Sequence, residues 1–184
     1  MNVHCIFLQI QTPRAPRARA VGAAPLTGDP GCGCSVHLVD GYPYRGAMSY
    51  AGDLSPTEAW ALLSAEPRAV LVDVRSEAEW TFVGLPDVTS LGKKVVTVVW
   101  SHWPSGTRNE DFVADLRETG VDAQGPVLFL CRSGARSRAA AEAATAAGIA
   151  PSYNISEGFE GDLDEEGHRG RNGWRASGLP WRQS

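Results

Sequence analysis

Short, almost uninterrupted apolar runs recur along the chain, and segments with helical spacing lie between them. The runs occupy residues 69–74, 95–100 and 127–130, and we expect a further short strand at residues 153–155. A strand that is apolar at nearly every position is buried on both faces, which is the environment of a parallel sheet. Strands that alternate with helices predict an α/β fold with a mostly parallel, open sheet and helices on both faces.

Specific residues mark the ends of two predicted helices. Ser55 and Glu58 form a capping box, with Pro56 at the first helical position, so a helix should follow. Gly148 comes after an alanine-rich segment and should end a helix there. We expect helices at residues 56–64, 76–82, 109–118 (capped by Asn109) and 137–147, and a tail over residues 158–184 that wraps the surface.

The composition of the chain changes at about Met48. Residues 1–47 contain four Arg and two acidic residues, a net charge of +2, and show no sustained apolar period. The rest contains 13 basic and 19 acidic residues, a net charge of −6, and all six tryptophans. The sequence predicts one domain over residues 50–184. We interpret residues 1–47 as a disordered N-terminal extension, or as a misassigned start with Met48 the true first residue; a transit peptide is the alternative.

The cysteines follow the same division. Cys5, Cys32 and Cys34 lie in the N-terminal segment and Cys131 stands alone in the domain, which is unlike the disulfide framework of a small secreted protein. Cys32 and Cys34 form a C-x-C pair without a second pair, so we expect no metal site.

Composition argues against two classes of partner. The net charge of −4 does not favour nucleic-acid binding, which needs a basic face. No apolar run approaches the roughly 20 residues that span a bilayer, so we expect no membrane partner and a cytoplasmic location. An acidic protein can still contain a local positive pocket for a small anion.

The most informative segment follows the apolar run at 127–130. Cys131 lies where a strand should end, and ligands of open α/β sheets bind beyond the carboxyl ends of strands. A helix should begin after a short loop, and its N–H groups and dipole would favour the thiolate form of Cys131. Arg132 and Arg136 add positive charge, and Gly134 lets the loop turn N–H groups inward. Each residue alone has an ordinary structural explanation, but together they predict a reactive cysteine.

Three stretches of the chain carry a resemblance to a known family. They are Cys131-Arg132-Ser133-Gly134-Ala135-Arg136-Ser137, Leu71-Val72-Asp73-Val74-Arg75 with Glu79-Trp80, and Tyr153-Asn154-Ile155 with Glu157-Gly158-Phe159. The first resembles the active-site loop of rhodanese-type sulfurtransferases, the second their Asp-Val-Arg strand, and the third the next strand and turn. The ends of the domain, residues 49–53 and 178–183, are similar to a small bacterial single-domain branch of that family. Many members carry Gly-His-Ile where this chain has Val83-Gly84-Leu85-Pro86.

The resemblance implies a rhodanese-like fold and a transfer of sulfur in two steps. The Cys131 thiolate would take the outer sulfur of a donor such as thiosulfate, and a thiol or cyanide would then remove it from the persulfide. A protein thiol could serve as the acceptor. The resemblance implies that Asp73 and Arg75 support the site and that no metal or organic cofactor is required. The substrate-binding residues would be those of the loop: Arg132, Ser133, Gly134, Ala135, Arg136 and Ser137.

Two other functions stay open at this point. Phosphatases and arsenate reductases resemble one another in having five residues between Cys and Arg, whereas four separate Cys131 from Arg136. A non-catalytic rhodanese-like binding module would commonly lack the cysteine, which is present here. Arg136 also has an alternative, structural role as the partner of a carboxylate such as Asp73.

Overall fold

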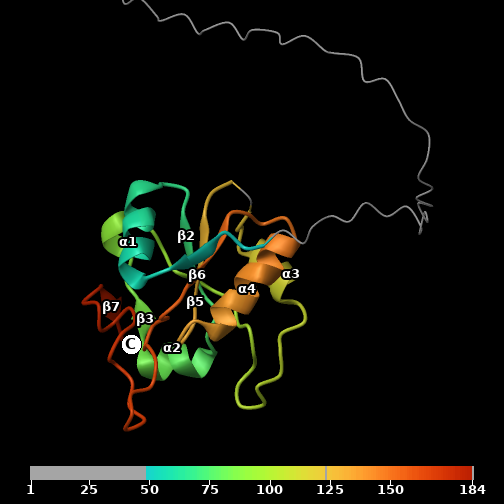
Figure 1. Cartoon of the computed structure of the whole chain (residues 1–184). Coiled ribbons are helices and arrows are strands. Elements are labelled where there is room, and N and C mark those ends of the chain that lie inside the picture. The colour runs from blue at the N-terminus through green and yellow to red at the C-terminus, as the bar shows by residue number, and fades with distance from the viewer. Residues whose placement is uncertain (1–48, 123, 184) are drawn as a thin grey trace, which may run out of the picture. The chain divides into compact units, whose positions relative to one another are not determined.

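The central element of the fold is a sheet of parallel strands. A computed structural model describes residues 49–122 and 124–183, and within these ranges five strands form one sheet in the order β1-β6-β5-β2-β4 (Figure 1). Every neighbouring pair in this sheet is parallel. The interpretations of residues 1–47 and of Met48 lie outside the described residues. The strands are β1 (Gly52–Leu54), β2 (Val70–Asp73), β4 (Val96–Thr97), β5 (Val127–Leu130) and β6 (Ser152–Ile155).

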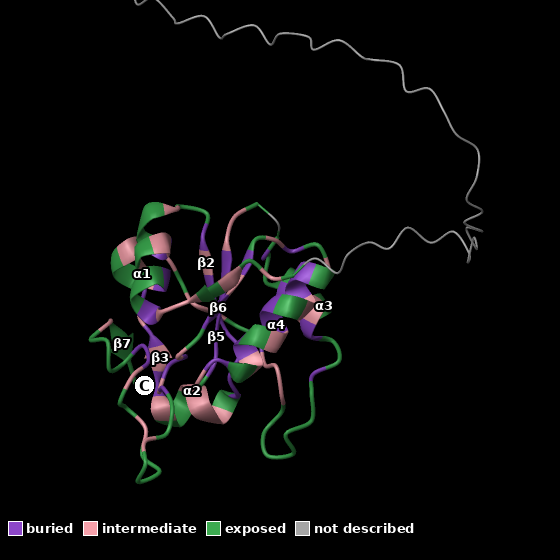
Figure 2. Cartoon of the chain, viewed as in Figure 1, coloured by how far each residue is buried: buried purple, intermediate pink, exposed green. Residues whose placement is uncertain are grey.

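Helices cover both faces of this sheet. Val72 and Phe129 pack in a cluster with residues of α3 and α4, whereas Leu71 and Leu128 pack in a second cluster with residues of α1. Successive side chains of a strand point to opposite faces of the sheet, so the apolar strands contribute residues to both clusters. Figure 2 shows buried residues along these strands and on the sides of the helices that face the sheet. The predicted α/β fold class is confirmed. The helical elements are α1 (Pro56–Ala65), α2 (Glu77–Val83), η1 (Thr89–Leu91), α3 (Phe112–Glu118) and α4 (Ala135–Ala146).

Capping boxes begin two of these helices. Ser55 and Glu58 form the predicted one at α1, where the Ser55 N–H donates to Glu58 Oε2 at 2.8 Å. Ser76 and Glu79 form a second one at α2, with the Ser76 N–H 3.0 Å from Glu79 Oε2. Each box satisfies backbone donors that the first turn of a helix leaves without partners. No described helix is both long and apolar enough to cross a bilayer.

Two predicted helix starts were wrong. α3 begins at Phe112 rather than at Asn109, because the Asn109 side chain accepts a bond from the Asp111 N–H at 3.0 Å and closes a turn before the helix. α4 begins at Ala135 rather than at Ser137, which therefore lies in the first turn of the helix.

The strand predicted at residues 95–100 is shorter and less buried than expected. Only Val96 and Thr97 belong to β4, and Thr97 is exposed. β4 is an edge strand whose one partner in the sheet is β2, so fewer neighbouring elements cover its side chains. The chain continues beside β2 after β4 ends, since the Val98 N–H donates to Asp73 O at 3.1 Å.

The segment after residue 157 contributes to the core, so its prediction as a surface tail was wrong. Trp174 is fully buried, and its ring meets that of Trp60 edge-on, with ring centres 5.9 Å apart. The indole Nε1 of Trp174 donates to Pro180 O at 2.8 Å, so the buried polar end of the ring is satisfied. Farther along, β7 (Trp181–Arg182) pairs antiparallel with β3 (Leu85–Pro86).

Candidate active site

Cys131 lies at the carboxyl end of β5, the middle strand of the sheet. The chain passes from β2 to β4 in one direction across the sheet and from β5 to β6 in the other, so the strand order reverses between β2 and β5. Ligands of open α/β sheets bind beyond the carboxyl ends of the strands at such a reversal. Asp73 ends β2 in register with Leu130, which places it beside the end of β5.

Two glycines let the loop after Cys131 pack against the turn after β6. Gly134 has a φ of +98°, and a Cβ there would overlap the Ser156 carbonyl oxygen. Gly158 has a φ of +61°, and a Cβ there would lie 2.5 Å from the Cys131 carbonyl oxygen. Any other residue at either position would strain the backbone and also clash with the facing main chain.

Main-chain hydrogen bonds join the same two segments. The Phe159 N–H donates to Cys131 O at 2.8 Å, and the Glu160 N–H donates to Arg132 O at 3.0 Å. The carbonyl groups at the start of the loop therefore point toward the segment after β6, and they do not compete for the space around the cysteine sulfur.

Two donors approach the Cys131 sulfur. The Gly134 N–H donates to Sγ at 3.1 Å, and the Ser137 hydroxyl lies 3.2 Å from Sγ. Both residues belong to the N-terminal end of α4, where free N–H groups and the helix dipole favour an anion. Cys131 is 1% exposed. A negative charge on this sulfur would therefore be stabilised by dipoles of the protein more than by water.

A chain of hydrogen bonds runs from the buried sulfur to Asp53, an exposed residue of β1. The Ser137 hydroxyl lies 2.7 Å from Asn154 Oδ1, and Asn154 Nδ2 donates to Asp53 Oδ1 at 2.8 Å. The hydrogen bond from Asn154 lowers the pKa of Asp53, so the ionised carboxylate can only accept hydrogen bonds. Asn154 therefore directs its amide NH₂ toward Asp53 and its amide oxygen toward Ser137. The one hydroxyl proton of Ser137 therefore has Asn154 Oδ1, Gly134 O and the sulfur as competing acceptors.

Sequence reasoning named Ser137 but missed Asn154 and Asp53. The two meet because β1 and β6 pair in parallel, with Asp53 opposite Asn154. The strand β1 was not predicted, so only the polar Asn154 within an apolar strand could have signalled a buried contact.

Arg136 pairs with Glu79. Its Nη1 donates to Glu79 Oε2 at 2.8 Å and its Nη2 to Oε1 at 2.7 Å, with both side chains largely buried. Burial alone would raise the pKa of Glu79, but the hydrogen bonds from Arg136 and from the Ser76 N–H hold it at about 2. The pKa of Arg136 is raised, first by its hydrogen bonds to Glu79 and less by the charges of Cys131 and Asp73. The carboxylate partner of Arg136 is therefore Glu79 and not Asp73.

Asp73 forms a fully buried ion pair with Arg75. Arg75 Nη2 donates to Asp73 Oδ2 at 2.6 Å and to Gly84 O at 2.7 Å, and the guanidinium lies 4.1 Å from the ring centre of Phe159. Both side chains are inaccessible to solvent. The pair connects β2 to the segment after α2 and to the turn after β6. Neither Asp73 nor Arg75 lines the cavity that is described next.

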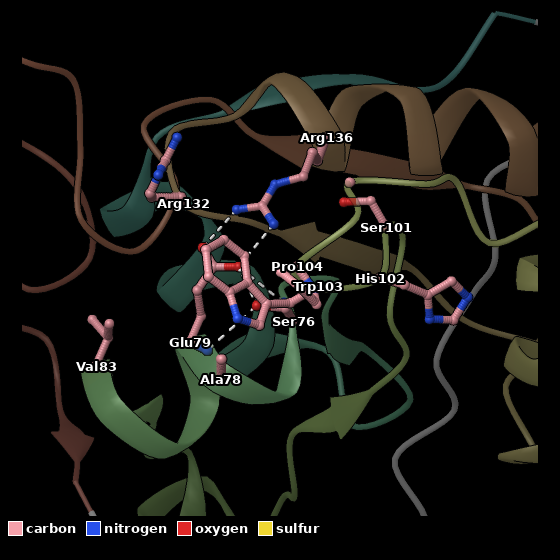
Figure 3. A pocket seen from close by; sticks show the side chains of 11 residues that line it. Ser76, Ala78, Glu79, Val83, Ser101, His102, Trp103, Pro104, Arg132 and Arg136 are labelled. Carbon is pink, nitrogen blue, oxygen red and sulfur yellow. Dashed lines mark hydrogen bonds and ion pairs between the residues drawn. The ribbon is translucent and has the colours of Figure 1, made fainter.

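A cavity of about 430 Å³ lies between α2, the segment 101–106 and the loop after Cys131 (Figure 3). Arg132 lines it from the loop, Arg136 from the first turn of α4, Glu79 from α2 and Trp103 from the opposite segment. Ser133, which is half-buried, and Ala135, which is exposed, do not line it. Of the predicted substrate-binding residues, Arg132 and Arg136 therefore line the cavity with their side chains, while Gly134 and Ser137 approach the sulfur.

One group of side chains in the described ranges has the spacing of metal ligands. Donor atoms of Asp164, Glu166 and His168 lie within 4.8 Å of one another. The Glu166 and His168 N–H groups both donate to Asp164 Oδ1, so a hydrogen-bonded turn accounts for the grouping. The group belongs to the segment after β6 and does not line the cavity.

The sequence of the chain is similar to a known domain family and to several proteins. A family model described as the STR4 middle domain matches residues 51–184. The chain is 35% identical over 129 residues to the uncharacterized protein RC0915 of Rickettsia conorii, a match that covers 70% of this chain and 95% of that protein. It is 29% identical over 128 residues to rhodanese-like domain-containing protein 4, chloroplastic, of Arabidopsis thaliana, covering 69% of this chain and 25% of the plant protein.

A solved structure is also similar. The crystal structure of Rv0390 from M. tuberculosis is matched with 62% sequence identity and a TM-score of 0.69. The match covers 74% of this chain and 100% of the other. The family match extends from β1 to β7 and includes both Cys131 and the cavity.

Proposed function

Because the chain belongs to the STR4 middle-domain family and has a rhodanese-like fold, we propose that it is a single-domain sulfurtransferase that carries a sulfane sulfur on Cys131. One observation carries the proposal: the Cys131 sulfur accepts the Gly134 N–H and faces the Ser137 hydroxyl at the N-terminus of α4. Donors arranged in this way stabilise a thiolate, which is the nucleophilic form of cysteine. They would stabilise a persulfide anion on the same residue in the same way.

In the first step the Cys131 thiolate attacks the outer sulfur of thiosulfate. A bond forms between Sγ and that sulfur, the sulfur–sulfur bond of thiosulfate breaks, and its electron pair leaves on sulfite. In the second step the sulfur of a thiolate, or the carbon of cyanide, attacks the outer sulfur of the persulfide. The bond to Sγ breaks and the Cys131 thiolate is restored, with no cofactor and no net oxidation.

The anionic donor would be held by Arg132, by the N–H groups of the loop and by the N–H groups of Arg136 that its two bonds to Glu79 leave free. Arg132 is exposed at the cavity, so its guanidinium can turn toward an oxyanion. The sulfur acceptor is a small thiol or a protein thiol, and the proposal needs neither a nucleic acid nor a membrane. A free reactive thiol persists in a reducing compartment, so we place the activity in the cytoplasm.

The test is sulfur uptake followed by transfer. Wild-type protein treated with thiosulfate should gain one sulfur by intact mass, mapped to Cys131 by peptide analysis, and should then release it to cyanide as thiocyanate. Cys131→Ser should gain none while keeping its melting temperature, since serine is nearly isosteric but far less nucleophilic at neutral pH. An aryl phosphate tested on the same preparations separates phosphatase chemistry. Absence of sulfur uptake by the wild type would leave a binding module as the better description.

A further inference from the structure

The cavity in front of Arg132 and Arg136 is larger than an inorganic sulfur donor needs. Its volume is about 430 Å³, which lies within the range of pockets that bind organic ligands. One water molecule takes up roughly 30 Å³ of the liquid, so a compact oxyanion would leave most of this volume to solvent. The size of the cavity fits an organic molecule.

The charge of the cavity fits one acidic group. Two guanidinium groups line it, but that of Arg136 is bound by both carboxylate oxygens of Glu79. Arg132 has no ion pair among the described residues and is exposed. The lining therefore offers one uncompensated positive charge, whereas a dianion such as thiosulfate is best matched by two.

Trp103 is the largest apolar side chain that lines the cavity, and it lies on the segment opposite the loop with Pro104, Ser101 and His102. It is 73% exposed, so most of its ring is uncovered. Ala78 and Val83 add apolar lining from α2. The segment that carries Trp103 is closed on itself, since the His102 N–H donates to Thr107 O at 2.8 Å. An exposed aromatic ring on a braced segment is a surface on which an organic group can stack with little loss of conformational entropy.

We infer that the cavity binds an organic thiol, as the sulfur acceptor, that has an aromatic or other apolar body against Trp103 and a carboxylate against Arg132. The inference rests on the proposed function and names the substrate class of the cavity. Arg132, which follows Cys131 in the chain, and Arg136 line this cavity, whereas Cys131 itself does not. The thiolate of the bound molecule attacks the outer sulfur of the Cys131 persulfide, a new sulfur–sulfur bond forms, and the Cys131 thiolate leaves. The transferred sulfur departs as the organic persulfide, so atoms and charge balance without a further reactant.

The experiment isolates the second step. Protein is loaded with thiosulfate, freed of excess donor and checked by intact mass, then mixed with an acceptor while the loss of the added sulfur is followed. The acceptors are thiosalicylate, which has a ring and a carboxylate, thiophenol, which has the ring alone, and cyanide. For each acceptor the rate constant of the wild type is divided by that of a variant, so the intrinsic reactivity of the acceptor cancels.

Trp103→Ala should lower the rate constant about tenfold for thiosalicylate and for thiophenol, and much less for cyanide. Arg132→Gln should lower it about tenfold for thiosalicylate and much less for thiophenol. Phe82→Ala is the matched control, because Phe82 is 75% exposed but does not line the cavity, and its ratios should stay near one.

Each variant is loaded with excess thiosulfate until intact mass shows the added sulfur, so a weaker affinity for the donor does not enter the ratios. Ratios that are then equal for all three acceptors in Trp103→Ala and in Arg132→Gln would overturn this inference and leave the sulfurtransferase proposal standing. Failure of the wild type to load sulfur on Cys131 would overturn both. A ratio in Phe82→Ala as large as that in Trp103→Ala would also contradict the inference, since the effect would not depend on the cavity.

Discussion

Arg136 and Glu79 form two parallel hydrogen bonds, of 2.8 Å and 2.7 Å, that join the first turn of α4 to the first turn of α2. The same Glu79 carboxylate accepts the Ser76 N–H at 3.0 Å and so caps α2. One carboxylate therefore links the start of α2 to the start of the helix that faces the Cys131 sulfur. A change at either residue should affect stability and activity together.

A double-mutant cycle separates these two effects. Arg136→Ala should lower the free energy of unfolding by roughly 1–3 kcal/mol, because it leaves the largely buried Glu79 carboxylate without its cation. Glu79→Gln keeps an acceptor for the Ser76 N–H, and adding it to Arg136→Ala should restore part of the loss. Urea unfolding and sulfur-transfer kinetics are measured on the same preparations. Restored stability with activity still low would assign Arg136 to donor binding, whereas recovery of both would make its role structural.

The pair should also make stability depend on acid pH. The folded-state pKa of Glu79 is lowered from 4.5 to about 2, so its ionised form stabilises the fold above the unfolded pKa and this stabilisation is lost as the pH falls through about 2. The unfolding free energy of the wild type should exceed that of Glu79→Gln by roughly 2 kcal/mol at neutral pH. The difference should shrink between pH 4.5 and 2. A difference that stays constant over this interval would show that Glu79 does not titrate with folding.

Gly134 and Gly148 offer a matched pair of substitutions. Both have positive φ values, +98° and +84°, but a Cβ at Gly148 meets nothing within 4 Å, whereas one at Gly134 overlaps the Ser156 carbonyl oxygen. Gly148→Ala should cost about 1 kcal/mol from backbone conformation alone. Gly134→Ala should cost more than roughly 3 kcal/mol and abolish sulfur uptake. Equal losses in thermal unfolding would show that the backbone around Gly134 can move away.

Ser137 and Asn154 should change the reactivity of Cys131 in opposite directions. Ser137→Ala removes a donor 3.2 Å from the sulfur and should slow alkylation of Cys131 by iodoacetamide at a fixed pH. Asn154→Ala removes the acceptor 2.7 Å from the Ser137 hydroxyl, so the proton becomes free to turn to the thiolate and alkylation should quicken. The rate is read on folded protein, with circular dichroism as the control. Changes of the same sign would show that Asn154 and the sulfur do not compete for the serine proton.

The periodic features of the fold could be predicted from the sequence. The runs that became β2 and β5 are apolar at consecutive positions because both faces of the sheet are covered, and that environment leaves a pattern in the sequence itself. The capping box at Ser55 is also a local signal, since its partners lie three residues apart.

Contacts between distant segments could not be predicted in the same way. Glu79 and Arg136 lie 57 positions apart, and Asn154 and Asp53 lie 101 apart, so no local spacing records either contact. The burial of Trp174 has the same origin, because its ring packs against Trp60 of α1, a distant contact that a charged, Gly-rich segment does not reveal. The roles proposed for Cys131 and the residues around it stay predictions until sulfur transfer is measured.

The bonds from Phe159 and Glu160 to the carbonyl groups of Cys131 and Arg132 also have a consequence for the order of assembly during synthesis. A nascent chain that has emerged only as far as α4 contains the cysteine, the strand before it and the helix after it, but not the segment that binds the loop carbonyls. The loop cannot reach its final geometry until the residues beyond β6 have left the ribosome. The thiol would therefore acquire its full set of surroundings only after all the strands of the sheet have been synthesised.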